Sequence, residues 1–108
     1  MSVCTGSWLL AKAGIIDVRR VTSNKIYFNM ATQQSKRVEC IPKARWVEGG
    51  PILTASGVSA GMDMALAAIA SLFGKANALE IANRTEYTWN QDSEDNPFHQ
   101  FLNMAILV

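Results

Sequence analysis

One short stretch near the start of the chain has the residue types of a nucleophile turn. Cys4 lies between Ser2 and Gly6, with one residue separating it from each, and an apolar segment that predicts a helix follows at once. A nucleophile at a strand-to-helix turn needs small neighbours, because its backbone is held in a sparsely populated conformation while strand and helix approach closely. The pattern therefore predicts that Cys4 is exposed at such a turn as a thiol nucleophile.

The surroundings of Cys4 would assist this chemistry. Backbone amides at the start of the following helix favour a thiolate over a thiol, and the N–H of Thr5 is placed to stabilise a developing oxyanion. Two observations weigh against it. A lone cysteine is often a small buried hydrophobic residue, and only residues 1–3 precede Cys4, whereas a buried strand has about five.

A second motif competes for the role of nucleophile. Residues 57–61 match the G-x-S-x-G pattern of serine hydrolases, and the only histidine, His99, follows them. Such patterns are common at strand-to-helix turns, and the hydrolases that use this one have much longer chains. We therefore expect the glycines to permit a tight turn, Ser59 or Ser56 to cap a helix, and His99 to lie on a solvated tail.

The composition argues against several classes of protein. Among the 108 residues, ten Lys and Arg balance nine Asp and Glu, so no basic face indicates a nucleic acid or membrane partner. Cys4 and Cys40 do not form a disulfide framework and no export signal is present, which makes a reducing cytoplasm the expected location. The apolar stretch 57–73 is too short to span a bilayer. No metal and no cofactor is expected.

The rest of the pattern predicts alternating strands and helices. Helices are expected at 5–13, about 26–34, 57–73 and 75–85, and strands within 15–23 and at 37–41, 44–47 and 52–56. Residues 48–51 would turn the last two strands into a hairpin, and the polar residues 90–97 predict a loop or loose tail before an apolar end, 98–108. Cys40 is expected to pack in a half-buried strand. The apolar positions of the helices include Trp8, Leu9, Ala13, Leu72, Phe73, Ala78, Leu79 and Ala82.

The order of these motifs resembles the ThiJ/PfpI superfamily, which is class I glutamine amidotransferase-like, and within it the isonitrile hydratase-like branch. The resemblance covers nearly all of residues 2–98. The two Gly-rich corners in this order are much more specific than either alone. The matching segments are Val3-Cys4-Thr5-Gly6, Leu9 to Gly14, Thr22-Ser23-Asn24-Lys25, Ala44-Arg45-Trp46-Val47 and Ser56 to Leu66.

The resemblance implies an α/β fold, a flavodoxin-like three-layer sandwich that is N-terminally truncated here. Residues 1–90 would form a partial domain that begins at the nucleophile turn, and 91–108 a C-terminal tail. Family members carry further strands before this turn, with an acidic residue that hydrogen-bonds the cysteine and a glycine that supplies a second oxyanion donor. We expect this chain to lack both. Many relatives have a histidine where this chain has Asn24, so no Cys-His dyad is expected.

The function implied is hydration or hydrolysis of a small electrophilic substrate, such as an isonitrile, through attack by Cys4. Thr5 would stabilise the developing charge, and Asn24, Gly57 and Val58 would line the substrate pocket. Activity is expected to be impaired by the missing N-terminal half. The alternative is a non-catalytic module of the same fold that binds a small ligand, senses oxidants or dimerises. The expected partners are a small molecule and a second copy of the chain.

Overall fold

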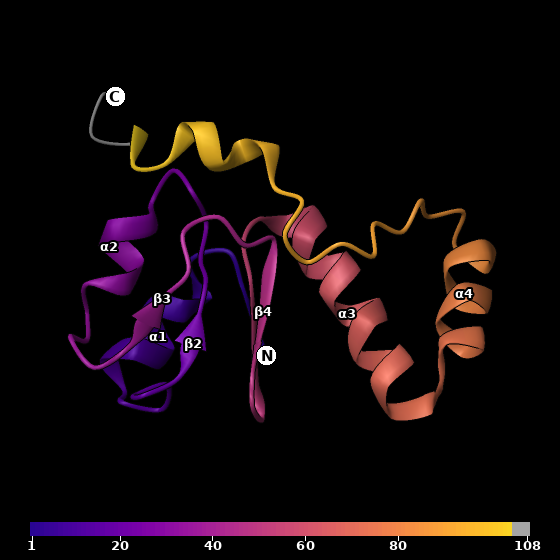
Figure 1. The fold of residues 1–108 in the computed structure, drawn as a ribbon, viewed down its shortest axis with the longest axis horizontal. Coiled ribbons are helices and arrows are strands. Elements are labelled where there is room, and N and C mark those ends of the chain that lie inside the picture. The colour runs from indigo at the N-terminus through magenta and orange to yellow at the C-terminus, as the bar shows by residue number, and fades with distance from the viewer. Residues whose placement is uncertain (105–108) are drawn as a thin grey trace.

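Short strands and helices alternate along most of the chain in this computed structural model, which describes residues 1–104 (Figure 1). The arrangement confirms a mixed α/β fold of the kind expected for part of a flavodoxin-like domain. The elements are β1 (Ser2–Val3), α1 (Gly6–Lys12), β2 (Arg20–Val21), α2 (Phe28–Thr32), β3 (Glu39–Cys40), β4 (Trp46–Gly49), β5 (Ile52–Ala55), α3 (Val58–Phe73), α4 (Lys75–Arg84) and the 3₁₀ helix η1 (Pro97–Phe101).

The larger sheet has the strand order β1-β5-β4, and it contains the predicted hairpin. β4 and β5 are antiparallel and Gly49 pairs with Ile52, so the turn consists of Gly50 and Pro51. β1 pairs in parallel with β5, which brings Val3 opposite Ala55. The residue after Val3 is Cys4, so the strand required before the nucleophile turn is present, although it has only two residues and lies at the sheet edge.

The second sheet consists of β2 and β3 in parallel, and it lies beside the hairpin. The backbone N–H of Thr22 donates to Thr54 Oγ1 at 2.8 Å, which ties the end of β2 to β5. A side chain at Gly49 would collide with the Arg20 carbonyl, so β4 approaches β2 as closely as only glycine permits. These contacts place residues 22–25 beside the turn at Cys4.

Helix α3 packs on β1 at the second Gly-rich corner. A Cβ atom on Gly61 would lie 2.7 Å from Val3 Cγ1, so this glycine is needed for close contact between the helix and the strand that leads to Cys4. Gly57 precedes the helix in an extended conformation, and no side chain in the described part of the chain caps the first turn. The predicted cap by Ser56 or Ser59 is therefore wrong.

Replacing Gly61 with alanine is expected to lower the free energy of unfolding by about 1 to 3 kcal/mol, because overpacking forces backbone shifts. Gly57→Ala is the matched control, since its new methyl group meets no atom within 4 Å and its φ of −94° suits alanine. Urea denaturation of both variants measures the difference. Equal midpoints would show that α3 does not depend on close packing at Gly61.

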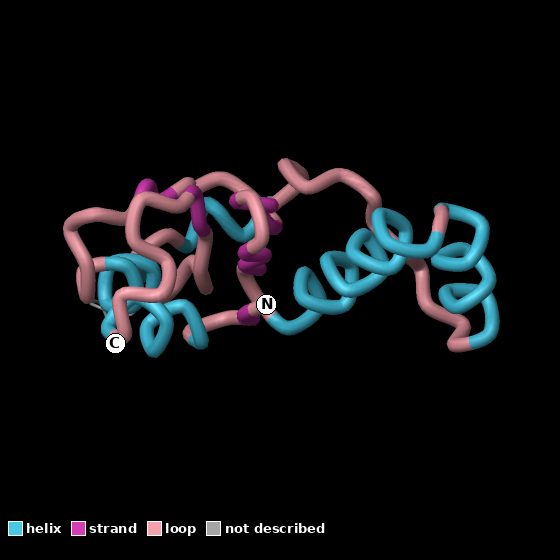
Figure 2. The backbone as a smooth tube through the Cα atoms, turned by 90° about the horizontal axis from the view of Figure 1, so that it is seen from below, coloured by secondary structure: helices cyan, strands magenta, loops and turns pink. Residues whose placement is uncertain are grey.

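Several helical apolar residues are less buried than their spacing predicts. The contacts of α4 are concentrated on α3, through a hairpin at Gly74 that extends away from the sheets (Figures 1 and 2). Ala78 and Ala82 are buried there as predicted, but Leu72, Phe73 and Leu79 are exposed. In α1 the buried residues are Ser7 and Ala11 rather than Trp8, Leu9 and the following Ala13. Within residues 1–104, no helix is long and apolar enough to cross a membrane.

The C-terminal segment contacts the body of the protein at several points, which differs from a loose tail (Figure 1). The carbonyl of Ser93 accepts from the N–H of Arg45, and Asn96 Nδ2 donates to the Ala44 carbonyl at 3.1 Å. Beyond η1, the N–H of Asn103 donates to the Lys25 carbonyl at 2.8 Å. The sequence predicts an apolar end at 98–108, and the part of it from residue 105 onward lies outside the described residues. A domain boundary at residue 90 stays a prediction.

Candidate functional site

Cys4 has the backbone conformation expected of a nucleophile turn. Its φ angle is 60°, in the left-handed region that non-glycine residues rarely adopt. The turn is fixed on both sides. The N–H of Cys4 donates to the Ala55 carbonyl at 3.1 Å, and its carbonyl accepts from Ser23 Oγ at 2.9 Å and from the N–H of Asn24 at 3.3 Å. The half-buried side chain of Cys4 is thereby held between β1 and α1.

The Asn24 side chain lies directly against the sulfur. Its Nδ2 donates to Cys4 Sγ at 3.3 Å. The orientation of the amide is set by its oxygen, which accepts from the N–H of Ile26 at 3.0 Å and of Tyr27 at 3.4 Å. A donor fixed toward sulfur stabilises the thiolate more than the thiol. Asn24 was predicted to line the substrate pocket, and the structure gives it this additional contact with the candidate nucleophile.

Thr5 follows the turn and precedes α1. Within residues 1–104 its N–H has no backbone acceptor, and its side chain forms no capping hydrogen bond. The N–H is therefore available to a substrate. Thr5 also borders an apolar groove of about 260 Å³ formed with Trp8, Tyr27, Met30 and Ala31. The exposed Trp8 lies in the wall of this groove.

The other two predicted site residues, Gly57 and Val58, differ in their surroundings. Gly57 and Asn24 line one cavity, which does not include Cys4. Val58 is 73% exposed and is absent from the walls of that cavity. The structure thus brings together Cys4, Thr5 and Asn24, places Gly57 in an adjoining cavity and leaves Val58 on the surface.

The competing serine motif does not form a hydrolase site in the described part of the chain. Ser59 is exposed on the first turn of α3, and His99 is half-buried in η1, where no hydrogen bond joins the two side chains. Cys40 packs beside the cluster of Ala11, Ile16 and Val21, and burial raises the pKa of its thiol. Of the two cysteines, only Cys4 lies on a turn with a positive φ angle.

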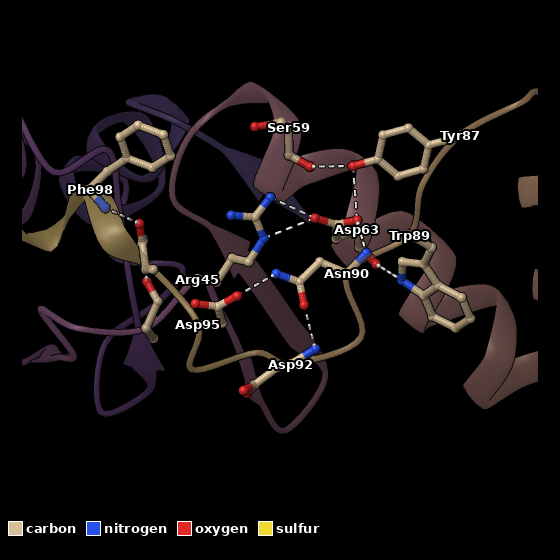
Figure 3. A network of polar contacts seen from close by, with 11 residues as sticks. Arg45, Ser59, Asp63, Tyr87, Trp89, Asn90, Asp92, Asp95 and Phe98 are labelled. Carbon is tan, nitrogen blue, oxygen red and sulfur yellow. Dashed lines mark hydrogen bonds and ion pairs between the residues drawn. The ribbon is translucent and has the colours of Figure 1, made fainter.

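A buried carboxylate missed at the sequence level organises the junction of β4, α3 and the C-terminal loop (Figure 3). Asp63 is fully buried, and its Oδ2 accepts from Arg45 Nε and Nη2 at 2.8 and 2.7 Å. Its Oδ1 accepts from the Tyr87 hydroxyl at 2.8 Å and from the N–H of Asn90 at 2.9 Å. Trp89 Nε1 donates to its carbonyl at 3.2 Å. In the sequence this residue only interrupts an apolar run.

Lys25 is a second polar residue that the sequence did not single out. Its side chain is 2% exposed, and Nζ donates to Thr22 Oγ1 at 2.7 Å and to the Ser23 carbonyl at 3.4 Å. The ammonium also lies 5.4 Å from the centre of the Phe28 ring. No carboxylate within residues 1–104 forms an ion pair with it. Burial lowers the pKa of Lys25 from 10.5 to about 8.

This lysine is expected to make the stability depend on pH. Between pH 8 and 10.5 the folded state has released the Lys25 proton while the unfolded state still binds it, so the free energy of unfolding rises with pH. Relative to Lys25→Met, wild type should gain about 1 to 2 kcal/mol from pH 7.5 to 9.5. Urea denaturation at several pH values measures this difference. The comparison with Lys25→Met cancels the contributions of all other titrating groups. If the difference in free energy of unfolding between the two proteins did not change with pH, the lowered pKa of Lys25 would be contradicted.

The described residues contain no group of three or more His, Cys, Asp or Glu side chains that could hold a metal ion. Only Asn24 forms a side-chain hydrogen bond with Cys4 Sγ in this part of the chain, so no carboxylate reaches the thiol there. The site can therefore supply a thiol on a fixed turn, an amide donor aimed at the sulfur and a free backbone N–H. These groups suit addition of sulfur to an electrophilic carbon.

Comparisons with known proteins show what the chain is similar to. A model of the DJ-1/PfpI family matches residues 1–71. The chain is 34% identical over 87 residues to an isonitrile hydratase from Pseudomonas putida. That match covers 80% of this chain and 36% of the relative, so the chain spans about a third of the length of this relative.

Proposed function

Because the chain belongs to the DJ-1/PfpI family, we propose that Cys4 is the nucleophile for hydration of a small electrophilic substrate of the isonitrile class. The observation that carries this proposal is the geometry of Cys4, whose φ is 60° and whose Sγ accepts from Asn24 Nδ2. The similarity to an isonitrile hydratase supports the choice of substrate class. Since the chain spans only part of that relative, the activity is a proposal for this chain.

The proposed reaction has two steps. The Cys4 thiolate adds to the terminal carbon of the isonitrile, and that same carbon takes a proton from solvent, which gives a thioformimidate, S–CH=N–R. Water then adds to the same carbon, and the C–S bond breaks to release an N-substituted formamide and the thiol. Overall, one water molecule is consumed and no oxidant or reductant is needed.

The residues around Cys4 would act at different stages. Asn24 stabilises the thiolate before the attack, because its amide oxygen is held by backbone N–H groups and its nitrogen faces the sulfur. The free N–H of Thr5 stabilises the charge that develops on the adduct. Gly57 adjoins Asn24 in the neighbouring cavity. The exposed Val58 could contact substrate only on the outer side of the site.

Alkylation with iodoacetamide tests whether Cys4 is activated. Cys4 is expected to react at least tenfold faster than Cys40 at neutral pH, because burial raises the pKa of Cys40. Asn24→Ala should slow the labelling of Cys4 at neutral pH, because it removes the hydrogen bond to Sγ, and Asn24→His, which restores a donor, should recover part of the rate. Mass spectrometry of tryptic peptides separates the two sites.

Two outcomes would overturn the assignment. Labelling of Cys4 no faster than a free thiol in an unfolded peptide would show that the turn does not activate it. An unchanged rate of Cys4 labelling at neutral pH in Asn24→Ala, with wild-type stability, would show that the amide does not affect the reactivity of the thiol.

A non-catalytic role is the second candidate. It is favoured by the absence of a carboxylate at the thiol within residues 1–104, and it includes ligand binding, oxidant sensing and dimerisation. Ligand binding that persists in Cys4→Ala, together with no turnover by wild type, would support this role. Nucleophilic attack and oxidant sensing both require a reduced thiol, so we propose a reducing compartment such as the cytoplasm. We also propose a small-molecule partner and a homodimer.

A further inference from the structure

Asn24 also borders a cavity that does not include Cys4. Its volume is about 230 Å³, below the roughly 300 to 1,000 Å³ of pockets for drug-sized ligands, so an occupant would be small. Four segments far apart in sequence line it, namely residues 24–26, Arg45, the corner that leads into α3, and the segment from Asn96 through η1. The residues that matter for its chemistry are Asn24, Lys25, Arg45, Gly57, Phe98 and Phe101.

Two basic residues, Lys25 and Arg45, line this cavity. Arg45 is 9% exposed, and its Nε and Nη2 both donate to Asp63, while Nη1 has no acceptor within residues 1–104. Figure 3 shows this third nitrogen directed away from Asp63, on the side of Phe98. Lys25 adds a buried ammonium whose hydrogen-bond acceptors are neutral oxygens. Because Asp63 neutralises Arg45, one positive charge is left without a counter-ion in the described part of the chain.

The rest of the cavity wall provides hydrogen-bond donors, and none of its described residues is acidic. No aspartate or glutamate lines the cavity. At the start of α3, the first N–H group that donates to a helical acceptor is that of Gly61, which donates to the Gly57 carbonyl. Within residues 1–104, no side chain caps the N–H groups of residues 58–60. The start of this 16-residue helix therefore adds positive potential to that of the two cations.

The opposite side of the cavity is aromatic. Phe98 and Phe101 lie on η1, with ring centres 6.4 Å apart. The position of η1 is fixed at both ends, since Asn96 Nδ2 donates to the Ala44 carbonyl and the N–H of Asn103 donates to the Lys25 carbonyl. The cavity thus joins a cationic wall to an apolar one.

We propose that this cavity binds a small monocarboxylate that carries an apolar, preferably aromatic, group. The carboxylate accepts from Arg45 Nη1 and from the amides at the start of α3, and Lys25 supplies the balancing charge. The apolar group contacts Phe98 and Phe101. This binding does not rest on the proposed reaction of Cys4, and Cys4→Ala is expected to bind the same ligand with unchanged affinity.

Titration of the full chain with benzoate, followed by ¹H–¹⁵N NMR, tests this site. Saturable shifts are expected at the amides of residues 57–60 and 98–101. Benzamide, which has the same shape without the charge, and acetate, which lacks the ring, should each bind at least tenfold more weakly. Lys25→Met should weaken benzoate binding at least tenfold, whereas Lys12→Met, on the exposed face of α1, should leave it unchanged.

Phe98→Ala keeps the test decisive if Lys25→Met does not fold, because Phe98 is 55% exposed and its loss should be tolerated. Phe98→Ala should bind benzoate more weakly than wild type does, and it should bind acetate with the same affinity as wild type. Equal affinity of wild type for benzoate and benzamide would overturn the proposal, as would shifts that avoid both segments of the cavity. Phosphate binding in preference to benzoate would also overturn it and would identify a site for inorganic anions.

Discussion

Asp63→Ala is expected to lower the free energy of unfolding by about 3 to 5 kcal/mol. The carboxylate is fully buried and accepts two hydrogen bonds from Arg45, which is itself 9% exposed. Its removal leaves a guanidinium buried without a counter-ion, and it also removes the acceptor of the Tyr87 hydroxyl and the Asn90 N–H. A loss of this size is a large fraction of the about 5 to 15 kcal/mol that stabilises a typical domain.

Urea denaturation of wild type and variant measures this loss, with Glu80→Ala as the matched control. Glu80 forms an ion pair of the same length, 2.7 Å, with Arg84, but both side chains are exposed. Its removal should cost no more than about 0.5 kcal/mol. Similar costs for the two variants would show that the Asp63 network does not stabilise the fold. Tyr87→Phe should fall between them, since it removes one hydrogen bond worth about 1 kcal/mol.

Features set by neighbouring residues could be predicted from the sequence. The β4–β5 hairpin and helix α3 follow from local alternation, helical spacing and the glycines that flank them. The turn at Cys4 was predicted from the size of its neighbours, and the φ of 60° agrees with that prediction. The family was reached through the order of the motifs, and the comparisons confirm it.

Features that depend on distant partners could not be predicted. Asp63 contacts residues 18 to 27 positions away, so in the sequence it is only an acid within an apolar run. Asp63 becomes buried beside a Trp, a Tyr and an Arg because the C-terminal loop crosses α3, and only the folded structure shows this crossing. The donor from Asn24 to Cys4 likewise depends on the packing of residues 22–25 against the turn, 20 positions away.

Helical spacing also predicts apolar helix faces that no other element packs against within the described residues. Leu72 and Phe73 continue the apolar pattern of α3, but they lie where the α3–α4 hairpin extends away from the sheets (Figure 1). Trp8 borders an apolar groove beside Thr5 rather than a closed core. Spacing shows which side of a helix is apolar, whereas burial depends on what packs against that side.

Cys4→Ala is expected to reduce the proposed hydration of an isonitrile by about a thousandfold or more, because loss of a nucleophile removes the covalent route entirely. Cys40→Ala is the control, since the half-buried Cys40 packs against the cluster of Ala11, Ile16 and Val21 and should be dispensable for turnover. The rate of formamide formation at saturating isonitrile, monitored by chromatography, measures the activity of both variants. Equal rates in wild type and Cys4→Ala would exclude Cys4 as the nucleophile.

The most direct test of the central claim is to observe the bond between Cys4 and the substrate carbon. The full chain would be mixed with an alkyl isonitrile and quenched at early times, and its tryptic peptides analysed by mass spectrometry. We predict that the peptide of residues 1–12, which contains Cys4, gains the mass of one isonitrile, and that this gain is absent in Cys4→Ala. Formamide production without any adduct on that peptide, or an adduct on the Cys40 peptide of residues 38–43 instead, would contradict the account.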